Sequence, residues 1–318
     1  MVSKHSFRER NNIRILITGG SGMLGQNLVK SLSHTNHAVL APGRSELNCL
    51  DAIGVRDYIG EQQPDLVIHC AGLVGGISAN IASQYLFFKD NMLMSINVID
   101  ACLNAGVKEL LNISSTNIYP DTQFDKQFYE SDILAGKLNK STEGYGLAKG
   151  CSSKLAEFAS SQFDVRYRSI IPSNIYGRFD SFSPSKSHMI PGIIRRIHEA
   201  FVSGLDSVEV WGDGSAKRGF LFAQDLADFI VTILEKVSLL PQNLNVCPDH
   251  DYSVFEYYKI VAGIVGYDGN FYFNKSMPVG SKLKKINCDQ AASMGWVEKT
   301  PIKEGIQKTY EYFLEILK

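Results

Sequence analysis

The feature that most constrains the fold is a short apolar stretch that runs directly into a glycine-rich loop. Residues Ile13 to Thr18 are typical of a buried parallel strand, and the loop Gly19-Gly20-Ser21-Gly22-Met23-Leu24-Gly25 follows at once, ahead of an apolar-periodic helix. Such glycines allow a sharp turn close to a pyrophosphate, while the helix N-terminus offers unpaired N–H groups to phosphates. The pattern predicts dinucleotide binding, with an ordinary tight loop as the alternative. The predicted contacts are Gly19, Ser21, Gly22, Met23, Leu24 and Gly25.

A second predicted strand, Ala38 to Ala41, should end near the adenosine ribose of that dinucleotide. An acidic residue there would hold the 2′-hydroxyl of NAD, but the chain gives Pro42-Gly43-Arg44-Ser45 instead. Because a guanidinium suits a 2′-phosphate, Arg44 favours NADP(H) over NAD(H). Two alternatives stay open, since Glu46 could serve a ribose and Arg44 could be a solvated loop residue.

Further strands and helices alternate along the chain. We expect strands at 65–70, 110–114, 164–171 and 243–246, and helices at 253–265 and 302–317. This alternation predicts an α/β protein with a Rossmann-type, doubly wound parallel sheet and a smaller C-terminal substrate lobe. We assign 1–173 and 219–247 to the dinucleotide-binding domain, and 174–218 and 248–318 to the substrate lobe.

A long helix is predicted from Gln84 to Asn104, and it is apolar on two sides. One side carries Tyr85, Phe88, Met92, Ile96, Ile99 and Leu103; the other carries Leu93, Met94, Val98 and Cys102. A helix that is apolar on two sides is buried on two sides. One side can cover the sheet, and the other needs a partner subunit or a neighbouring helix, so we expect a homodimer.

A serine cluster and a tyrosine–lysine pair mark the expected reaction site. Ser114 and Ser115 end a predicted strand, where ligands bind in open α/β sheets. About 30 residues on, Tyr145 and Lys149 stand four apart at the head of a probable helix, on one face. An adjacent ammonium would lower the pKa of the phenol and make it a usable acid. An exposed surface pair is the plainer interpretation of Tyr-x-x-x-Lys alone.

Composition excludes several kinds of partner. The 318 residues carry a formal net charge of −1 without a basic block, so neither nucleic acid nor an anionic membrane surface is indicated. The polar N-terminus lacks a signal-peptide core, and we expect a cytoplasmic protein. The six cysteines show no paired spacing, so we expect small apolar residues in a reducing compartment, with no disulfide framework and no metal site.

Taken together, these residues resemble the extended short-chain dehydrogenase/reductases that act on nucleotide sugars. The likeness runs from Ile15 to about Trp296 and is closest to the GDP-L-fucose synthase (GDP-4-keto-6-deoxymannose 3,5-epimerase/4-reductase) type. Its specific parts are 19–25, 74–77, 115–120, 145–149, 174–177, 187–191, Arg195-Arg196, 210–212 and Arg218. The resemblance implies a Rossmann lobe with a smaller C-terminal lobe, a homodimer and NADP(H).

The resemblance also implies roles for individual residues. Ser115, Tyr145 and Lys149 would reduce a keto group at carbon 4: Tyr145 gives a proton, Ser115 shares the developing charge, and Lys149 keeps the phenol acidic and holds the nicotinamide ribose. Further cofactor contacts would be Arg44, Ala71, Gly72, Pro172 and Asn174. The GDP-linked 4-keto sugar would contact Val74, Gly75, Gly76, Asn174, His188, Met189, Ile193, Arg196, Trp211, Arg218 and Lys284.

One departure from the family pattern bears on the reaction. Epimerisation at carbons 3 and 5 uses a cysteine and a histidine in this family; His188 matches the histidine, but Asn117 stands in the cysteine's place. A carboxamide has no proton equilibrium in the useful range, so it cannot be the base. A second departure is Pro278-Val279-Gly280, where the family usually has Pro-Asp-Gly.

Three hypotheses follow from these residues. The leading one is an NADPH-dependent 4-reductase of a GDP-4-keto deoxyhexose or heptose that has lost epimerisation. The alternatives are a bifunctional GDP-L-fucose synthase with another base, and a non-catalytic NADP-binding scaffold on the same fold.

The NADP(H) assignment gives a testable prediction. Replacing Arg44 by Ala should raise the KM for NADPH much more than the KM for NADH, because only NADPH carries the 2′-phosphate that the guanidinium would bind. Steady-state kinetics with both cofactors measure the two changes. Equal changes would refute the assignment.

Overall fold

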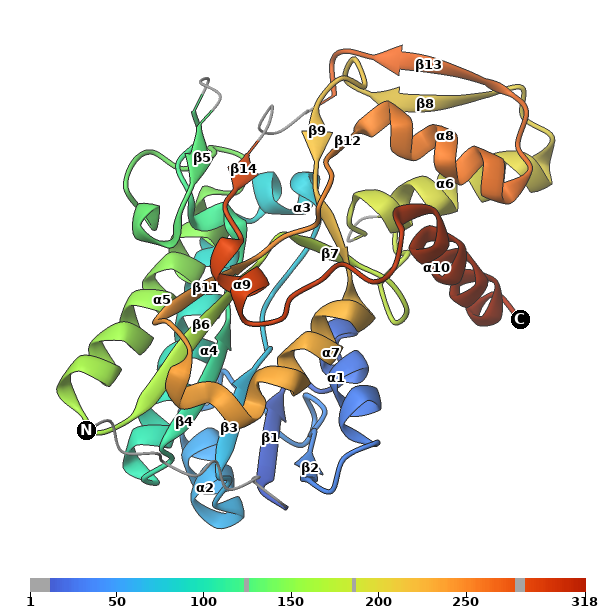
Figure 1. The fold of residues 1–318 in the computed structure, drawn as a ribbon. Coiled ribbons are helices and arrows are strands. Elements are labelled where there is room, and N and C mark those ends of the chain that lie inside the picture. Colours follow the sequence, from blue (N-terminus) through green and yellow to red (C-terminus); the bar gives the residue numbers. More distant parts are fainter. Residues whose placement is uncertain (1–11, 123–125, 185–186, 278–283) are drawn as a thin grey trace.

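A six-stranded parallel sheet forms the centre of the computed structural model, which describes residues 12–122, 126–184, 187–277 and 284–318 (Figure 1). The strands lie in the order β11-β6-β4-β3-β1-β2. Their bounds are β1 Arg14–Thr18, β2 Ala38–Leu40, β3 Leu66–His69, β4 Glu109–Ile113, β6 Arg166–Pro172 and β11 Asn243–Val246. Since β1 pairs with both β2 and β3, the strand order reverses there, which is where such sheets bind ligands.

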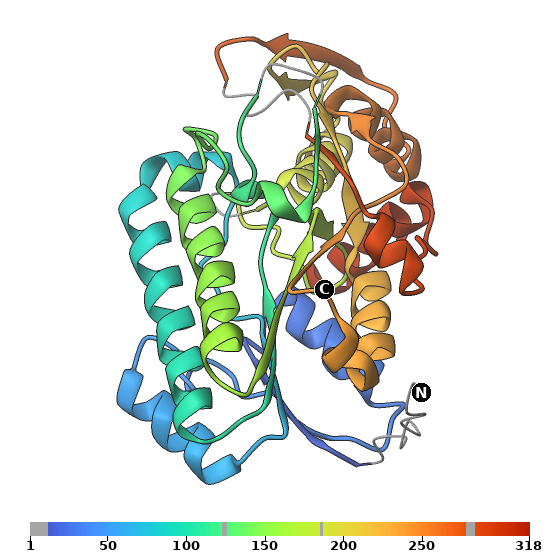
Figure 2. The ribbon, with the colours of Figure 1, turned by 60° about the vertical axis from the view of Figure 1, so that its left-hand side comes forward.

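Helices cover both faces of the sheet, which confirms the predicted doubly wound α/β fold (Figures 1 and 2). Helices α1 (Met23–Leu32) and α7 (Ala223–Ile233) lie on one face; α2 (Ala52–Gln62), α4 (Gln84–Asn104) and α5 (Glu143–Gln162) lie on the other. Strand β1 supplies Ile15 and Ile17 to the first core and Leu16 to the second. This alternation is the two-residue period of a strand buried on both sides.

Most predicted elements are present with shifted ends. Helix α4 has the predicted bounds, and β11 returns to the sheet beside β6 as expected. The sequence analysis did not predict α2 or α7. Helix α2 has a weakly amphipathic sequence, and its start at Asp51 is recognisable mainly from the carboxylate that caps the N–H groups of Ile53 and Gly54.

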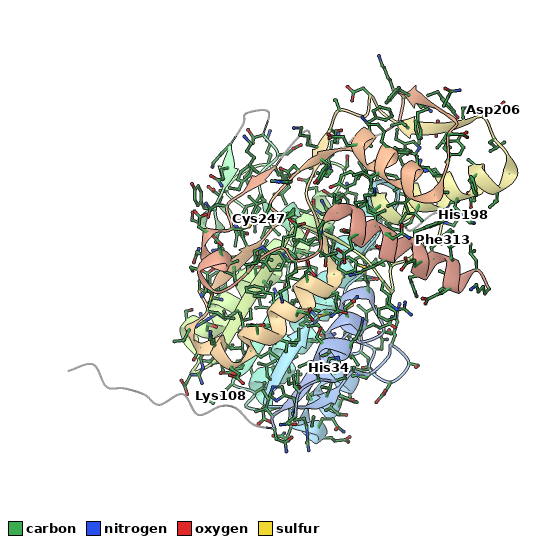
Figure 3. The ribbon with its side chains drawn as sticks, turned by 45° about the vertical axis from the view of Figure 1, so that its right-hand side comes forward. His34, Lys108, His198, Asp206, Cys247 and Phe313 are labelled. Carbon is green, nitrogen blue, oxygen red and sulfur yellow. A yellow bond between two sulfur atoms is a disulfide. The ribbon has the colours of Figure 1, made fainter. Side chains whose placement is uncertain are left out.

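The C-terminal lobe has a core of its own. Its elements are β7 Asn174–Tyr176, α6 Met189–Ser203, β8 Ser207–Trp211, β9 Lys217–Arg218, β10 Phe220–Phe222, β12 Tyr252–Ser253, α8 Val254–Val265, β13 Asn270–Asn274 and α10 Ile302–Ile316. Helix α6 packs on α10, where His198 lies edge-on to Phe313 with 5.2 Å between ring centroids (Figure 3). Residues of α6 that pack in this core are therefore unavailable to a ligand, and only the other residues of the helix can contact one.

Several short elements complete the described fold. They are α3 Ile77–Ala82, β5 Gln127–Phe128, β14 Lys285–Ile286, α9 Asp289–Ser293 and the 3₁₀ helices η1 Thr116–Ile118, η2 Glu130–Asp132 and η3 Leu234–Leu239. Strand β14 pairs with β5, so the chain returns from the C-terminal lobe to the neighbourhood of β4. Among the described residues, no helix is long and apolar enough to cross a membrane, and no three His, Cys, Asp or Glu side chains cluster as metal ligands.

Helices α4 and α5 lie side by side (Figure 2). Helix α5 therefore covers part of the second apolar side of α4. This agrees with one of the two alternatives expected from the sequence, in which a neighbouring helix rather than a partner subunit covers that side. Several large apolar side chains on the pair still face solvent, including Tyr85 (73% exposed), Phe88 and Leu93. The homodimer remains a prediction.

The expectation that all six cysteines are reduced is wrong for two of them. Cys247, just after β11, and Cys288, just before α9, form a disulfide, while Cys49, Cys70, Cys102 and Cys151 are free. The spacing that suggests no pairing is a poor guide, because the partners are 41 residues apart and only the fold brings them together.

The disulfide predicts a thiol count and a stability change. Thiol titration of the denatured, unreduced protein should give four thiols rather than six. The Cys288→Ser variant should lose about 2–4 kcal/mol of unfolding free energy, because a long loop is no longer closed in the unfolded chain. Denaturant titration measures it, with Cys151→Ser as the matched control. Six thiols in the denatured, unreduced protein would contradict the prediction.

Candidate functional site

A large cleft, with a volume of about 880 Å³, opens at the carboxyl ends of the central strands and is lined from both lobes. Every site residue predicted from the sequence lines this cleft except Ile193. Helix α6 presents Met189, Gly192 and Arg196 to the cleft, whereas the neighbouring Ile193 is fully buried in the core of the C-terminal lobe. Helical spacing alone would place Ile193 beside Met189 and Arg196, but the packing of the C-terminal lobe covers it, and we withdraw Ile193 as a ligand contact.

The strand–loop–helix unit fits a dinucleotide. Gly19 has a φ of +70°, and a Cβ there would lie 2.7 Å from the backbone of Ala71, so the loop depends on glycine at this position. Helix α1 begins at Gly22, which provides no side-chain cap, and its first turn contains no acidic residue. Its N–H groups are therefore suited to phosphate oxygens. Arg44 is exposed beyond the end of β2 and lines the same cleft.

Ser115 and Tyr145 meet at the floor of the cleft. Ser115 follows β4 directly, and Tyr145 lies in the first turn of α5, where a hydrogen bond joins the two hydroxyl groups. The ring of Phe87 on α4 packs edge-on against Tyr145 with 6.4 Å between centroids. The phenol is thus held beside a second hydroxyl group, as reduction of a carbonyl group requires.

Lys149 is almost fully buried one turn further along α5. Its Nζ donates to the backbone carbonyl of Ile113 at 2.9 Å, and a Cβ on Gly72 would lie 3.5 Å from it. Burial lowers the pKa of Lys149 to about 8, so the ammonium form still prevails at neutral pH. Its charge also contributes to the lowered pKa of the neighbouring His69, which remains neutral.

The expected effect of Lys149 on the phenol is not what the structure shows. Burial raises the pKa of Tyr145 to about 12, and the opposing influence is the hydrogen bond from Ser115 rather than the ammonium. Desolvation outweighs the charge because the Lys149 ammonium is directed to the Ile113 carbonyl. Tyr145 therefore keeps its proton at neutral pH, which suits a proton donor.

Two polar residues of α4 position the site, and the sequence analysis missed both. The Asn91 side chain accepts from the N–H of Leu73 (2.9 Å) and donates to its carbonyl (3.0 Å), which fixes the loop after β3. Gln84 accepts from the N–H of Gly144 (2.7 Å) and so caps the start of α5. Neither residue carries a local signal, because Gln84 is the first residue of α4 and Asn91 acquires its partners only when the loop at Leu73 packs against it.

The opposite end of the cleft holds an aromatic–cation cluster. The Arg196 guanidinium lies 5.0 Å from the ring centre of Trp211 and 5.5 Å from that of Tyr258. Glu209 orients the indole by accepting from its N–H at 3.0 Å. Such a cluster offers both a flat surface for a base or ribose and a bidentate donor for phosphate.

Further cations and the histidine line the same region. Lys284 donates to the Tyr119 carbonyl at 2.7 Å, and burial lowers its pKa to about 8. Burial also lowers the pKa of Arg218 and of His188, which immediately precedes α6. The cleft thus combines cations for a diphosphate with an uncharged imidazole.

Asn117 lines the cleft within η1, directly after Ser115. Its backbone N–H donates to Ser115 Oγ at 3.3 Å, and its side chain is partly exposed. The carboxamide is therefore available for hydrogen bonding to a ligand near Tyr145, but not for proton abstraction. The second departure from the family pattern, Pro278-Val279-Gly280, lies outside the described residues.

Comparisons with known proteins agree with this geometry. Residues 15–247 match the model of the NAD dependent epimerase/dehydratase family. A GDP-L-colitose synthase of Yersinia pseudotuberculosis is 40% identical over 95% of this chain and 98% of its own, and a GDP-L-fucose synthase of Azorhizobium caulinodans is 39% identical over 95% and 96%.

Solved structures are similar over almost the full length. A GDP-6-OMe-4-keto-L-xylo-heptose reductase from C. jejuni superimposes with a TM-score of 0.89 at 25% identity, covering 97% of this chain and 99% of that one. MlghC, a GDP-mannoheptose C4 reductase from Campylobacter jejuni with NADP bound, has a TM-score of 0.83 at 26% identity, with 96% and 100% covered.

Asn91 provides a test of how the site is positioned. Asn91→Ala should leave the N–H and carbonyl of Leu73 without these partners and loosen the loop. We therefore expect the KM for the cofactor to rise about tenfold. A change of this size corresponds to the loss of one hydrogen-bonding group, which costs about 1–3 kcal/mol. Steady-state kinetics measure it, with Asn97→Ala, which contacts only the Cys49 carbonyl, as the control. An unchanged KM would contradict this role.

Proposed function

The chain belongs to the NAD dependent epimerase/dehydratase family, and from this premise we propose that it reduces carbon 4 of a GDP-4-keto sugar with NADPH. The observation that carries the proposal is the arrangement of Ser115, Tyr145 and Lys149 in one cleft with the aromatic–cation cluster. The protein is a nicotinamide-dependent oxidoreductase whose cofactor is NADP(H), in keeping with similar structures solved with NADP or NADPH.

Each residue at the cleft floor has a defined task. When bound, the reduced nicotinamide supplies the hydride. Tyr145 holds its proton at neutral pH and gives it to the oxygen at carbon 4 as negative charge develops there. Ser115 donates a hydrogen bond to the same oxygen and is hydrogen-bonded to the phenol, and Lys149 holds the nicotinamide ribose when the cofactor is bound. General acid catalysis of this kind contributes about 10²- to 10⁴-fold.

The substrate end supports a nucleoside diphosphate. Arg196, Arg218 and Lys284 provide three cations for its phosphates, and Trp211 provides a flat apolar surface. Guanosine rather than another nucleoside is supported by the names of the two relatives at 39% and 40% identity and of the similar heptose reductase, which are GDP-sugar enzymes. A deoxyhexose and a heptose are both compatible with these residues.

Absence of epimerase activity is the finer part of the proposal. Removing a proton beside a ketone needs a base, and the carboxamide of Asn117 is not one. The alternative is a bifunctional 3,5-epimerase/4-reductase that uses a different base. The names of the GDP-L-fucose and GDP-L-colitose synthases, at 39% and 40% identity, favour that alternative.

We also expect the protein to act as a homodimer. Tyr85, Phe88 and Leu93 on α4, together with Leu147 and Phe158 on α5, expose apolar surface over two adjacent helices. A paired copy would bury this surface, whereas a monomeric mass at micromolar concentration in solution scattering would count against the dimer.

The reductase assignment is tested with a substrate panel. The pure protein should oxidise NADPH with at least one GDP-4-keto hexose or heptose, and NMR then assigns the product. Tyr145→Phe should bind NADPH normally and lose about 10²- to 10⁴-fold in turnover, because the proton donor is absent. Tyr129→Phe, about half exposed and outside the cleft, is the control. Substantial turnover by Tyr145→Phe would overthrow the role.

Solvent deuterium tests for epimerisation separately. In D₂O, the product of the wild-type protein should carry no solvent deuterium at carbon 3 or 5, because Asn117 cannot exchange a proton there. The Asn117→Cys variant restores a titratable group at this position and is the matched comparison. Uptake at either carbon catalysed by the wild-type protein would favour the bifunctional alternative.

A further inference from the structure

Asp180 is a buried carboxyl group in the cleft that the proposed reaction does not use. Its side chain is 8% exposed, and it lies in the connection between β7 and α6. One oxygen, Oδ1, accepts from the N–H of Ser181 at 2.7 Å, whereas Oδ2 has no hydrogen-bond partner among the described residues. Buried polar atoms are normally paired, so Oδ2 is open to a partner that the described residues do not supply.

The segment that carries Asp180 lies against the first turn of α1. The buried Asn27 side chain donates both to the carbonyl of Met23 in that turn (2.8 Å) and to the carbonyl of Arg178 (3.1 Å). The N–H of Asp180 closes the next turn by donating to the Gly177 carbonyl at 3.3 Å. Asp180 is thereby tied to the phosphate-binding end of α1.

This turn is held in an uncommon conformation. Phe179 has a φ of +70°, which a residue with a bulky side chain rarely adopts. Its ring packs against Tyr312 of α10 at 5.5 Å, and the adjacent Arg178 pairs with Glu315 at 2.7 Å. Backbone strain of this kind persists where the surroundings over-determine it, often at ligand sites.

The charged groups around Asp180 are engaged elsewhere. Arg178 is paired with Glu315 of α10, and Arg195 of α6 is paired through Nη1 with Glu199 at 2.8 Å, while its Nε has no hydrogen-bond partner among the described residues. His188, ahead of α6, has a pKa lowered by burial, and the first turn of α1 contains no acidic residue. Burial is therefore unopposed by a cation and raises the pKa of Asp180 to about 7.

We propose that Asp180, in its neutral form, binds the diphosphate of the dinucleotide by donating its O–H to a phosphate oxygen. An ionised carboxylate beside a diphosphate would repel it, whereas a carboxylic acid supplies the donor that phosphate needs. The inference rests on the proposed use of NADP(H). The sugar nucleotide also contains a diphosphate, but the contact between Arg178 and α1 favours the dinucleotide.

The inference predicts a sign for the pH dependence of binding. The contribution of Asp180 is present below its pKa and is lost as the pH rises through about 7. In Asp180→Asn, the amide can donate at every pH, so this dependence should disappear. If only the neutral acid binds, the dissociation constant of the wild-type protein should rise by about tenfold per pH unit above the pKa.

The experiment titrates NADPH into wild-type protein and Asp180→Asn by cofactor fluorescence between pH 6 and 8. The ratio of the two dissociation constants cancels the titration of Lys149 and of the cofactor's own 2′-phosphate. We expect the ratio to rise about tenfold across this range. Asp164→Asn, which removes an exposed carboxylate paired with Lys108, should behave like the wild type. Thermal unfolding verifies that each variant is folded.

Each other outcome overturns the inference. A ratio that does not change with pH would show that Asp180 is structural, and a folded Asp180→Asn that no longer binds NADPH would show that the ionised form is needed. A matched titration with GDP should show no change in ratio; a rise there instead would move the contact to the other diphosphate. Failure of the wild-type protein to bind NADPH at any pH would refute the proposed function itself.

Discussion

The close approach of α5 to the carboxyl end of β4 determines the rest of the site. The side of this helix that faces the sheet consists of small residues, and a Cβ on Gly146 would lie 2.5 Å from the carbonyl of Asn117. Larger side chains would push the helix outward. Because it lies so close, Tyr145 meets Ser115 and the Lys149 ammonium reaches the Ile113 carbonyl. Helix packing, more than any single hydrogen bond, sets the distance between the reacting groups.

At the other end of the cleft, the important feature is how the Arg196 side chain is held in place. Arg196 lies between two aromatic rings and close to the core of the C-terminal lobe, so its charge is held in place by packing as well as by hydrogen bonding. Glu209 in turn fixes the indole of Trp211 and also accepts from Asn274 at 2.6 Å. A cation that is already ordered loses little side-chain entropy when a phosphate arrives. This end of the site is therefore suited to binding an anionic group such as a phosphate.

The sequence predicted the features that are encoded locally. The strand β1 with its glycine loop, the helix α4 and the Tyr145–Lys149 pair each depend on residues a few positions apart, so their patterns were readable. Asn91 was not, because an asparagine in a helix acquires its role only when the loop at Leu73 packs against it. The Cys247–Cys288 bond and the burial of Ile193 depend likewise on tertiary packing. The raised pKa of Tyr145 reflects desolvation, which spacing along a helix does not reveal.

Helix α6 has two roles in the molecule. One side of it, with Met189 and Arg196, lines the cleft, and the other side, with His198, packs on Phe313 of α10. A change in the α6–α10 contact would rotate or shift the helix as a rigid rod and carry Arg196 with it. Substrate preference in this protein can thus drift through substitutions remote from any ligand, and homologues with identical cleft residues need not share the same sugar.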